Sequence, residues 1–135
     1  MKRQTSETSD AAESFNADMD WFMGHVRSLS MTPEDCCADQ GNYLVAAELY
    51  YFLLGPTQLM DDPLSILSAE QMSAVQRLRE AVRLVPPEAR SGGTTAAASL
   101  TDMSHPSWVI PRQLANALLD VFLPLWPVSN LANKV

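Results

Sequence analysis

Two adjacent cysteines, Cys36 and Cys37, are the first residues to test for metal or redox chemistry. Consecutive residues of a helix project about 100° apart, so the two thiols cannot readily bind one ion or form an unstrained disulfide. The sequence has no C-x-x-C pair, and His25 and His105 lack the spacing of a zinc site. We therefore predict no metal and no cofactor, with one thiol buried and the other partly exposed.

Catalysis would need a nucleophile beside an oriented base, such as one of these thiols with His25 or His105. No pattern typical of a catalytic family surrounds them, and a histidine before a proline, as at His105, favours a loop or capping role. Glu48 lies inside an apolar run, so its burial would require a partner or a raised pKa. We interpret Glu48 as structural, paired with an Arg or Tyr or directed out through a gap, and predict a non-enzymatic protein.

Acidic residues dominate the first half of the chain. The net charge is −7, and between Glu7 and Asp62 there are 11 carboxylates and one basic residue, Arg27. Direct nucleic-acid binding is disfavoured because phosphate contact needs a basic surface. A basic protein partner is favoured, since complementary potentials speed and orient association. The alternative is an acidic surface that only keeps the protein soluble.

Tryptophan is enriched at the energetic centres of interfaces, so Trp21 and Trp108 are candidate exposed anchors. The other methionines and aromatic residues have helical spacing and are interpreted as core rather than as the lining of a ligand groove. We predict that a partner is bound by acidic residues and one tryptophan, namely Asp18, Asp20, Trp21, Glu34, Asp35, Asp39, Asp61 and Asp62.

A helix predicted over residues 32–54 positions several of these side chains. Thr32 can cap it and Pro33 suits its first position, with carboxylates in the first turn and a Gly-Pro pair at its end. Gly41 is the only break that the sequence suggests. Residues 43–54 are apolar nearly all round, which is typical of a helix surrounded by other elements.

A first helix is predicted from about Ser9, and it should form an antiparallel hairpin with the second. Its apolar face comprises Phe15, Met19, Phe22, Val26 and Leu29. A capping box at residues 68–71 starts a further helix that ends at Pro86, and its basic outer side spans residues 77–83. Residues 96–103 form either a short helix, capped by Thr94 or Thr95, or a mobile loop.

The last predicted helix begins at Pro111, after an extended segment over residues 105–110. Its apolar face comprises Leu114, Ala117, Leu118, Val121 and Phe122, and Leu125, Trp126 and Val128 are expected to fold back on the bundle. We predict an all-α fold, a compact bundle of four to five helices around a central apolar helix. Residues 1–8 are a disordered N-terminus and residues 9–135 are a single helical domain. No secretory signal or membrane span is evident, so the predicted location is cytoplasmic.

As a whole, this small acidic helical chain resembles the immunity proteins of bacterial contact-dependent growth inhibition and related toxin systems. The acidic segments at residues 18–20, 34–39 and 61–62 carry the resemblance, which concerns the general character of most of the chain. It implies an antitoxin that binds a nuclease-like toxin domain and blocks its basic surface.

Two alternatives remain. The first is a helical adaptor or homo-oligomeric structural subunit, in which the basic helix at residues 77–83 meets the acidic half of another copy. The second is a small-ligand-binding or enzymatic helical protein with Glu48, His25 or the cysteines lining a cavity.

Overall fold

The computed structural model describes residues 2–63 and 65–122. Within these ranges the chain forms helices and no strand, so the predicted all-α bundle is confirmed. The α-helices are α1 (Lys2–Ser30), α2 (Pro33–Asp39), α3 (Val45–Leu54), α4 (Gln58–Asp61), α5 (Ala69–Arg83), α6 (Ala96–Met103) and α7 (Val109–Phe122). Two short 3-10 helices, η1 (Pro87–Ala89) and η2 (Pro106–Trp108), lie between them.

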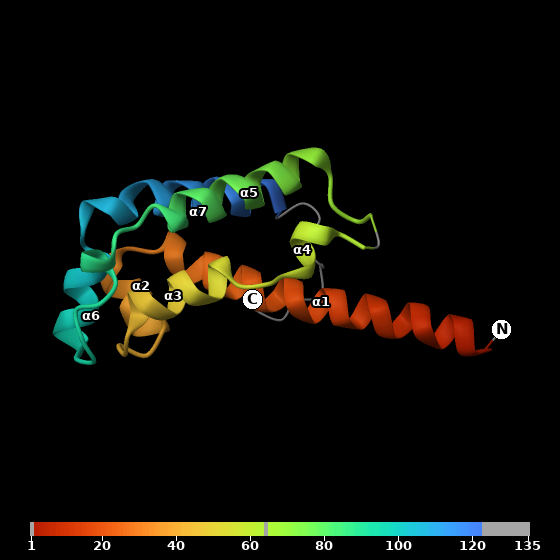
Figure 1. Cartoon of the computed structure of the whole chain (residues 1–135), viewed down its shortest axis with the longest axis horizontal. Coiled ribbons are helices and arrows are strands. Elements are labelled where there is room, and N and C mark those ends of the chain that lie inside the picture. Colours follow the sequence, from red (N-terminus) through yellow and green to blue (C-terminus); the bar gives the residue numbers. More distant parts are fainter. Residues whose placement is uncertain (1, 64, 123–135) are drawn as a thin grey trace.

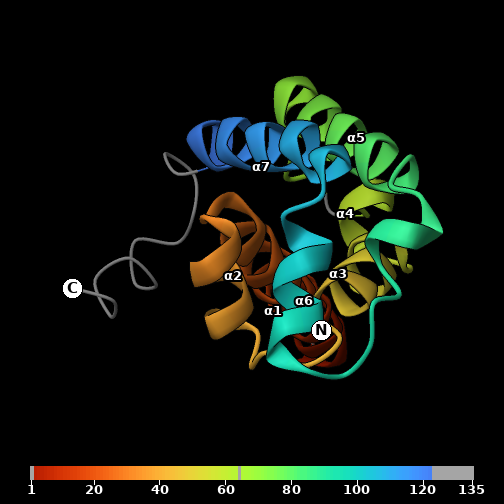
Figure 2. The same cartoon turned by 90° about the vertical axis from the view of Figure 1, so that its left-hand side faces the viewer.

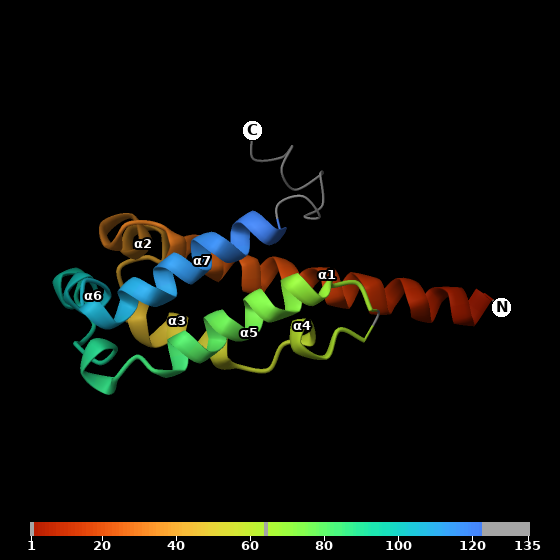
Figure 3. The same ribbon diagram turned by 90° about the horizontal axis from the view of Figure 1, so that it is seen from above.

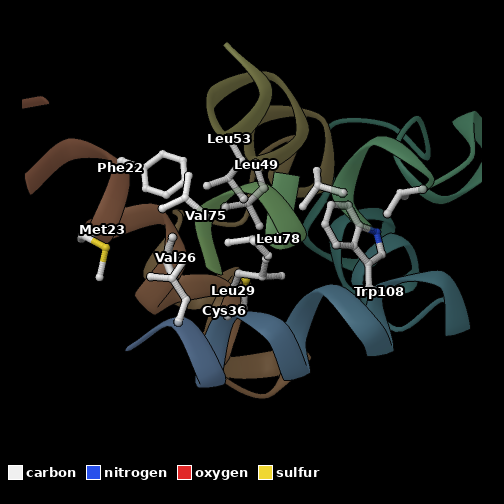
Figure 4. Packing of buried hydrophobic residues seen from close by; sticks show 14 of the residues in the cluster. Phe22, Met23, Val26, Leu29, Cys36, Leu49, Leu53, Val75, Leu78 and Trp108 are labelled. Atoms are coloured by element: carbon white, nitrogen blue, oxygen red, sulfur yellow. The ribbon is translucent and has the colours of Figure 1, made fainter. Parts of the chain in front are cut away.

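The helices form two layers. Helices α5 and α7 lie side by side over a layer that contains α1, α2 and α3 (Figures 1 and 2). Helix α7 packs extensively on both α5 and α1, and α3 packs on α1, α5 and α6. Figure 4 shows Val26 of α1, Leu49 of α3 and Leu78 of α5 together in the core. None of the described helices is both long and apolar enough to cross a lipid bilayer.

Helix α1 begins at Lys2, whereas the sequence predicted a disordered segment over residues 1–8 and a helix from about Ser9. No Gly or Pro occurs between residues 2 and 23, so the helix meets no strong breaker there. The first turns of α1 project beyond the rest of the bundle (Figure 3). Its predicted core face is confirmed: Phe15, Met19, Phe22, Val26 and Leu29 are buried, together with Met23.

The helix predicted over residues 32–54 is two helices, and the break falls at Gly41, the one position where the sequence suggested it, although it extends to Leu44. Thr32 caps α2 as predicted, because its hydroxyl accepts the Asp35 N–H at 3.2 Å. The turn to α3 then uses left-handed backbone at Gly41 (φ 87°), Asn42 (φ 58°) and Leu44 (φ 48°). Gly and Asn adopt this conformation readily, whereas a leucine does so only when its surroundings impose it. The sequence pattern carries no sign of such an imposed conformation.

Helix α3 buries one face rather than its whole circumference. Val45, Ala46, Leu49 and Leu53 are buried, but Tyr51 is 74% exposed. The run is therefore not surrounded on every side, as its apolar composition had indicated. The antiparallel return of the chain along α1 places α3 and then α4 beside it, and α1 contacts both (Figures 1 and 3).

Arg79 of α5 binds the carboxyl end of α3. Its Nη1 donates to the carbonyls of Leu53 at 2.8 Å and Gly55 at 2.9 Å, and its Nη2 donates to that of Leu54 at 3.3 Å. These carbonyls lie at the end of the helix, where intrahelical donors run out. Burial, and next the charge of Arg83, lower the pKa of the Arg79 guanidinium. Arg79 is thus a half-buried capping residue rather than part of a fully exposed basic side.

Two further helix starts follow their sequence signals. Ser68 and Gln71 form the predicted capping box of α5, and the Thr95 hydroxyl accepts the Ala98 N–H at 3.0 Å at the start of α6. Residues 96–103 are therefore helical, which resolves the choice between helix and loop. The Ser99 hydroxyl of α6 also accepts the Val45 N–H at 3.4 Å and so connects α6 to the first residue of α3.

Helix α7 begins at Val109, so the predicted extended segment over residues 105–110 was wrong. The 3-10 helix η2 precedes α7, and Pro111 lies inside the first turn, where its missing N–H needs no partner. The buried face comprises Pro111, Ala115, Leu118 and Phe122, while Ala117 is exposed. Leu118 and Phe122 of the predicted face are thus confirmed as buried, Leu114 and Val121 are half-buried, and Ala117 was misplaced. Leu125, Trp126 and Val128 lie outside the described residues.

Candidate partner-binding surface

Helices α1 and α3 bring four aromatic rings together at the surface. The Trp21 ring lies 4.9 Å from His25 and 5.4 Å from Phe52, and the Tyr51 ring lies 5.4 Å from Phe52. Nδ1 of His25 donates to the Trp21 carbonyl at 2.8 Å, which holds the imidazole against the indole. Trp21 is 57% exposed and Tyr51 is 74% exposed. Large aromatic side chains gathered in this way and left in water are typical of binding surfaces.

Three of these rings, those of Trp21, Tyr51 and Phe52, border a small pocket between α1, α3 and the start of α4. Its volume is about 160 Å³. We call it the aromatic pocket, and it is lined by Asp18, Trp21, Phe22, Tyr51, Phe52, Gly55, Pro56 and Thr57. Its lining therefore combines apolar aromatic surface with one carboxylate and contains no basic side chain.

Asp18 is half-buried at the edge of this pocket. Its Oδ2 accepts hydrogen bonds from the Thr57 hydroxyl at 2.8 Å and the Gln58 N–H at 2.6 Å. A carboxylate at the start of a helix satisfies an N–H that has no intrahelical partner. Asp18 thus holds the start of α4 against α1 while its charge remains beside the aromatic rings. Sequence reasoning predicted a partner contact here but not this structural role.

A cluster of carboxylates separate from Asp18 lies on α2, which packs against α1 and α6. Glu34, Asp35 and Asp39 are exposed, and we call them the α2 acidic group. Asp39 accepts a hydrogen bond from the Ser28 hydroxyl of α1, and Ser28 in turn accepts from Gln40 Nε2 at 2.7 Å. Glu34 and Asp35 lie in the first turn of α2, where the helix dipole favours carboxylates.

The remaining predicted acidic residues are divided between α1 and α4. Asp20 is exposed on α1, and Asp61 is exposed on α4. Asp62 is half-buried and has a left-handed backbone (φ 41°). Its carboxylate accepts the N–H groups of Ile66 at 2.8 Å and Leu67 at 3.0 Å, so it organises the turn that follows α4. The predicted acidic residues are thus distributed over separate helices rather than gathered on one.

Trp108 is fully buried, so its prediction as an exposed anchor was wrong. Its Nε1 donates to the Ala89 carbonyl at 3.0 Å, which satisfies the indole inside the core. His105 has the predicted capping role, since its Nδ1 accepts the Ser107 N–H at 3.1 Å. Glu48 is half-buried in the first turn of α3 and does not line the pockets described here.

Cys36 and Cys37 are both buried, so the expectation of one partly exposed thiol was wrong. Helix α6 packs against α2 and adds cover that the α2 sequence does not reveal. Burial raises the pKa of the Cys36 thiol from 9.0 to about 12, and burial followed by the charge of Glu34 raises that of Cys37. Both thiols are protonated at neutral pH, whereas a nucleophilic cysteine needs its thiolate form.

In the part of the chain that the structure describes, no three side chains of the His, Cys, Asp and Glu types converge as metal ligands. Comparisons with protein-family models, curated protein sequences and solved structures found no significant match. The assignment of the candidate site therefore rests on the geometry of its residues.

Sequence reasoning missed the contribution of α3 to this surface. Tyr51 and Phe52 were interpreted as core residues because their helical spacing is typical of buried faces. The available signal was at Trp21, which lies off the apolar face of α1 and was predicted to be exposed. The partners of Trp21 could not be identified without the packing of α3 on α1.

Proposed function

We propose that this protein is a cytoplasmic, non-enzymatic module that binds a basic protein partner. The observation that carries the proposal is the aromatic pocket, where two largely exposed aromatic residues, Trp21 and Tyr51, adjoin the Asp18 carboxylate. Trp and Tyr are enriched among the residues that dominate binding energy at protein interfaces. A net charge of −7 favours a partner of opposite charge.

The size of the pocket supports a macromolecular partner over a small ligand. At about 160 Å³ it is smaller than typical ligand sites, which enclose roughly 300–1,000 Å³. A single side chain projecting from a protein surface matches this volume better than a cofactor does. The α2 acidic group would add to the overall negative potential and so increase the rate of association with a basic partner.

The particular form that we propose is an immunity protein, which binds a nuclease-like toxin domain and blocks its basic surface. A substrate cleft for nucleic acid is rich in Lys and Arg, because it must contact phosphates. An acidic surface with aromatic anchors has the complementary chemistry. This form predicts one tightly bound partner at equal stoichiometry.

Affinity capture from the native cells tests the proposal. The tagged chain is compared with a variant that carries Trp21→Ala, Glu34→Gln and Asp35→Asn. Bound proteins are identified by mass spectrometry after washing at low and then high salt. We expect one basic protein at equal stoichiometry that is largely lost from the variant.

The control variant carries Glu80→Gln and Asp120→Asn, which remove two exposed carboxylates from α5 and α7. It should retain the partner, because its changes lie on the other layer of the bundle. The proposal is wrong if no stoichiometric basic protein is captured, or if both variants retain it equally. If a partner is captured, inhibition of its nuclease activity by the purified chain distinguishes the immunity form from other binding modules.

A further inference from the structure

We infer that the aromatic pocket receives an arginine side chain of the partner, with its guanidinium stacked on the aromatic walls and paired with Asp18. This inference rests on the proposed function and specifies the group that is recognised. It starts from the composition of the pocket lining, in which aromatic rings from α1 and α3 adjoin a single carboxylate.

The lining selects a cation. The faces of aromatic rings carry negative electrostatic potential and attract Lys or Arg side chains within about 6 Å of the ring centre. Trp21, Tyr51 and Phe52 supply three such rings, and Asp18 adds a formal negative charge. No basic side chain belongs to the lining, and the guanidinium of Arg79, which reaches the lining residue Gly55, is already bound to the carbonyls of residues 53–55.

The carboxylate is held in place before the partner arrives. Among the described residues, the hydrogen bonds to Asp18 both end on Oδ2, from the Thr57 hydroxyl and the Gln58 N–H. Oδ1 therefore keeps its capacity to accept a further hydrogen bond. A carboxylate fixed in this way loses little conformational freedom when it binds a charged donor, which favours affinity.

The geometry favours arginine over lysine. A guanidinium is planar, stacks on aromatic faces and donates several hydrogen bonds in one plane, whereas an ammonium is a compact and strongly hydrated point charge. The Trp21 and Phe52 ring planes lie at 87° to each other, so the lining contains aromatic rings in two orientations. A planar cation can stack on one wall while its edge faces the carboxylate.

The chain itself contains an example of this stacking. The guanidinium carbon of Arg90 lies 3.9 Å from the centre of the Tyr50 ring, which precedes Tyr51 in α3. A second surface hollow, between α5 and α7, provides the contrast. It has a volume of about 280 Å³ and is lined by both Glu70 and Arg77, so it has no comparable preference for a cation.

A peptide titration followed by NMR tests the inference on the full chain labelled with nitrogen-15. The probe is the blocked peptide acetyl-Gly-Arg-Gly-amide, and the readout is the indole N–H resonance of Trp21, assigned with Trp21→Ala. Peptides with citrulline, lysine or norleucine in place of arginine are titrated in parallel. Citrulline keeps the shape of arginine but carries no charge.

We expect a saturable shift of the Trp21 resonance with the arginine peptide, at least about fivefold weaker binding of the citrulline peptide and intermediate binding of the lysine peptide. Tyr51→Ala and Asp18→Asn should each weaken the arginine response by about threefold or more. Tyr43→Ala is the matched control, because Tyr43 is also exposed (53%) but lies in the turn before α3.

The inference is overturned if the arginine peptide leaves the Trp21 resonance unchanged, if citrulline binds equally well, or if Tyr51→Ala has no greater effect than Tyr43→Ala. These outcomes are separate from those of the capture experiment. A captured basic protein without arginine binding would retain the proposed function and remove the arginine pocket. Arginine binding without a captured protein would leave a guanidinium-binding pocket and remove the proposed function.

Discussion

Nη1 of Arg79 donates a hydrogen bond to the carbonyl oxygen of Leu53 at 2.8 Å and so joins α5 to the carboxyl end of α3. Arg79→Met keeps much of the aliphatic length but removes every hydrogen bond from the guanidinium. We expect the free energy of unfolding to fall by about 2 kcal/mol, because partly buried carbonyls lose a charged donor. Urea denaturation measures this loss. Arg83→Met, at an exposed position one turn later, should change stability by less than about 0.5 kcal/mol.

Two glycines should respond in opposite directions to replacement by alanine. A Cβ at Gly24, within α1, would meet no atom within 4 Å, so Gly24→Ala should stabilise the protein by about 0.5–1 kcal/mol through helix propensity. A Cβ at Gly92 would lie 2.6 Å from Oδ1 of the buried Asp102, whose Oδ2 accepts the Gly92 N–H. Gly92→Ala should therefore destabilise it by about 1–3 kcal/mol. Thermal unfolding measures both variants. A shift of the two melting temperatures in the same direction would contradict this packing.

The buried thiol of Cys36 should make stability depend on alkaline pH. Burial raises its pKa from 9.0 to about 12, so the unfolded chain loses this proton at lower pH than the folded chain does. Between these two values the unfolded state binds fewer protons. The free energy of unfolding should then fall as pH rises, by up to about 1.4 kcal/mol per pH unit from this group.

Urea denaturation from about pH 8 to about pH 11 tests this dependence, since the window spans the pKa of a thiol in the unfolded chain. Cys36→Ala should reduce the slope, although the cavity it leaves lowers stability at every pH. Val75→Ala is the control, because it also truncates a fully buried side chain but keeps both thiols. An equal slope in the wild type and in Cys36→Ala would count against a buried, protonated thiol.

Removal of the Asp18 carboxylate should loosen the start of α4. Asp18→Ala eliminates the acceptor of both the Gln58 N–H and the Thr57 hydroxyl, and we expect a loss of about 1–3 kcal/mol. Asp18→Asn keeps one carbonyl acceptor and should lose less. Hydrogen exchange of the Gln58 amide should accelerate in Asp18→Ala. Glu13→Ala, at an exposed position of α1, should leave that exchange rate unchanged.

Local chemistry in the sequence predicted much of this fold. The caps at Thr32, Ser68 and Thr95 mark helix starts that the structure contains, because a capping side chain acts within three residues of its own position. The turn before α3 was foreseen only as a possible break at Gly41, and its extension to Leu44 was missed because Leu44 has a left-handed conformation that its residue type disfavours. Such a conformation depends on tertiary contacts, including the hydrogen bond between Val45 and Ser99.

The candidate site was predictable only in part. Trp21 and Met23 both lie off the apolar face of α1, yet Trp21 is exposed and Met23 is buried, so spacing alone left the exposure of Trp21 open. Trp108 was misplaced because the Ala89 carbonyl that binds its indole is distant in the sequence. The pocket itself requires α3 to pack beside α1. The spacing of apolar residues identifies the buried face of a helix but not the helix that covers it. Asp18 was identified from its charge, while its capping of α4 depends on the same packing.

The packing of α7 on α1 has a consequence for the synthesis of the chain on the ribosome. The Asn116 side chain donates to the Ser30 carbonyl at 3.2 Å, and the two helices bury apolar faces from opposite ends of the described sequence. A nascent chain that ends before α7 leaves the apolar face of α1 without part of its cover. The core can therefore close only after α7 has been synthesised, and until then the uncovered apolar face of α1 favours aggregation.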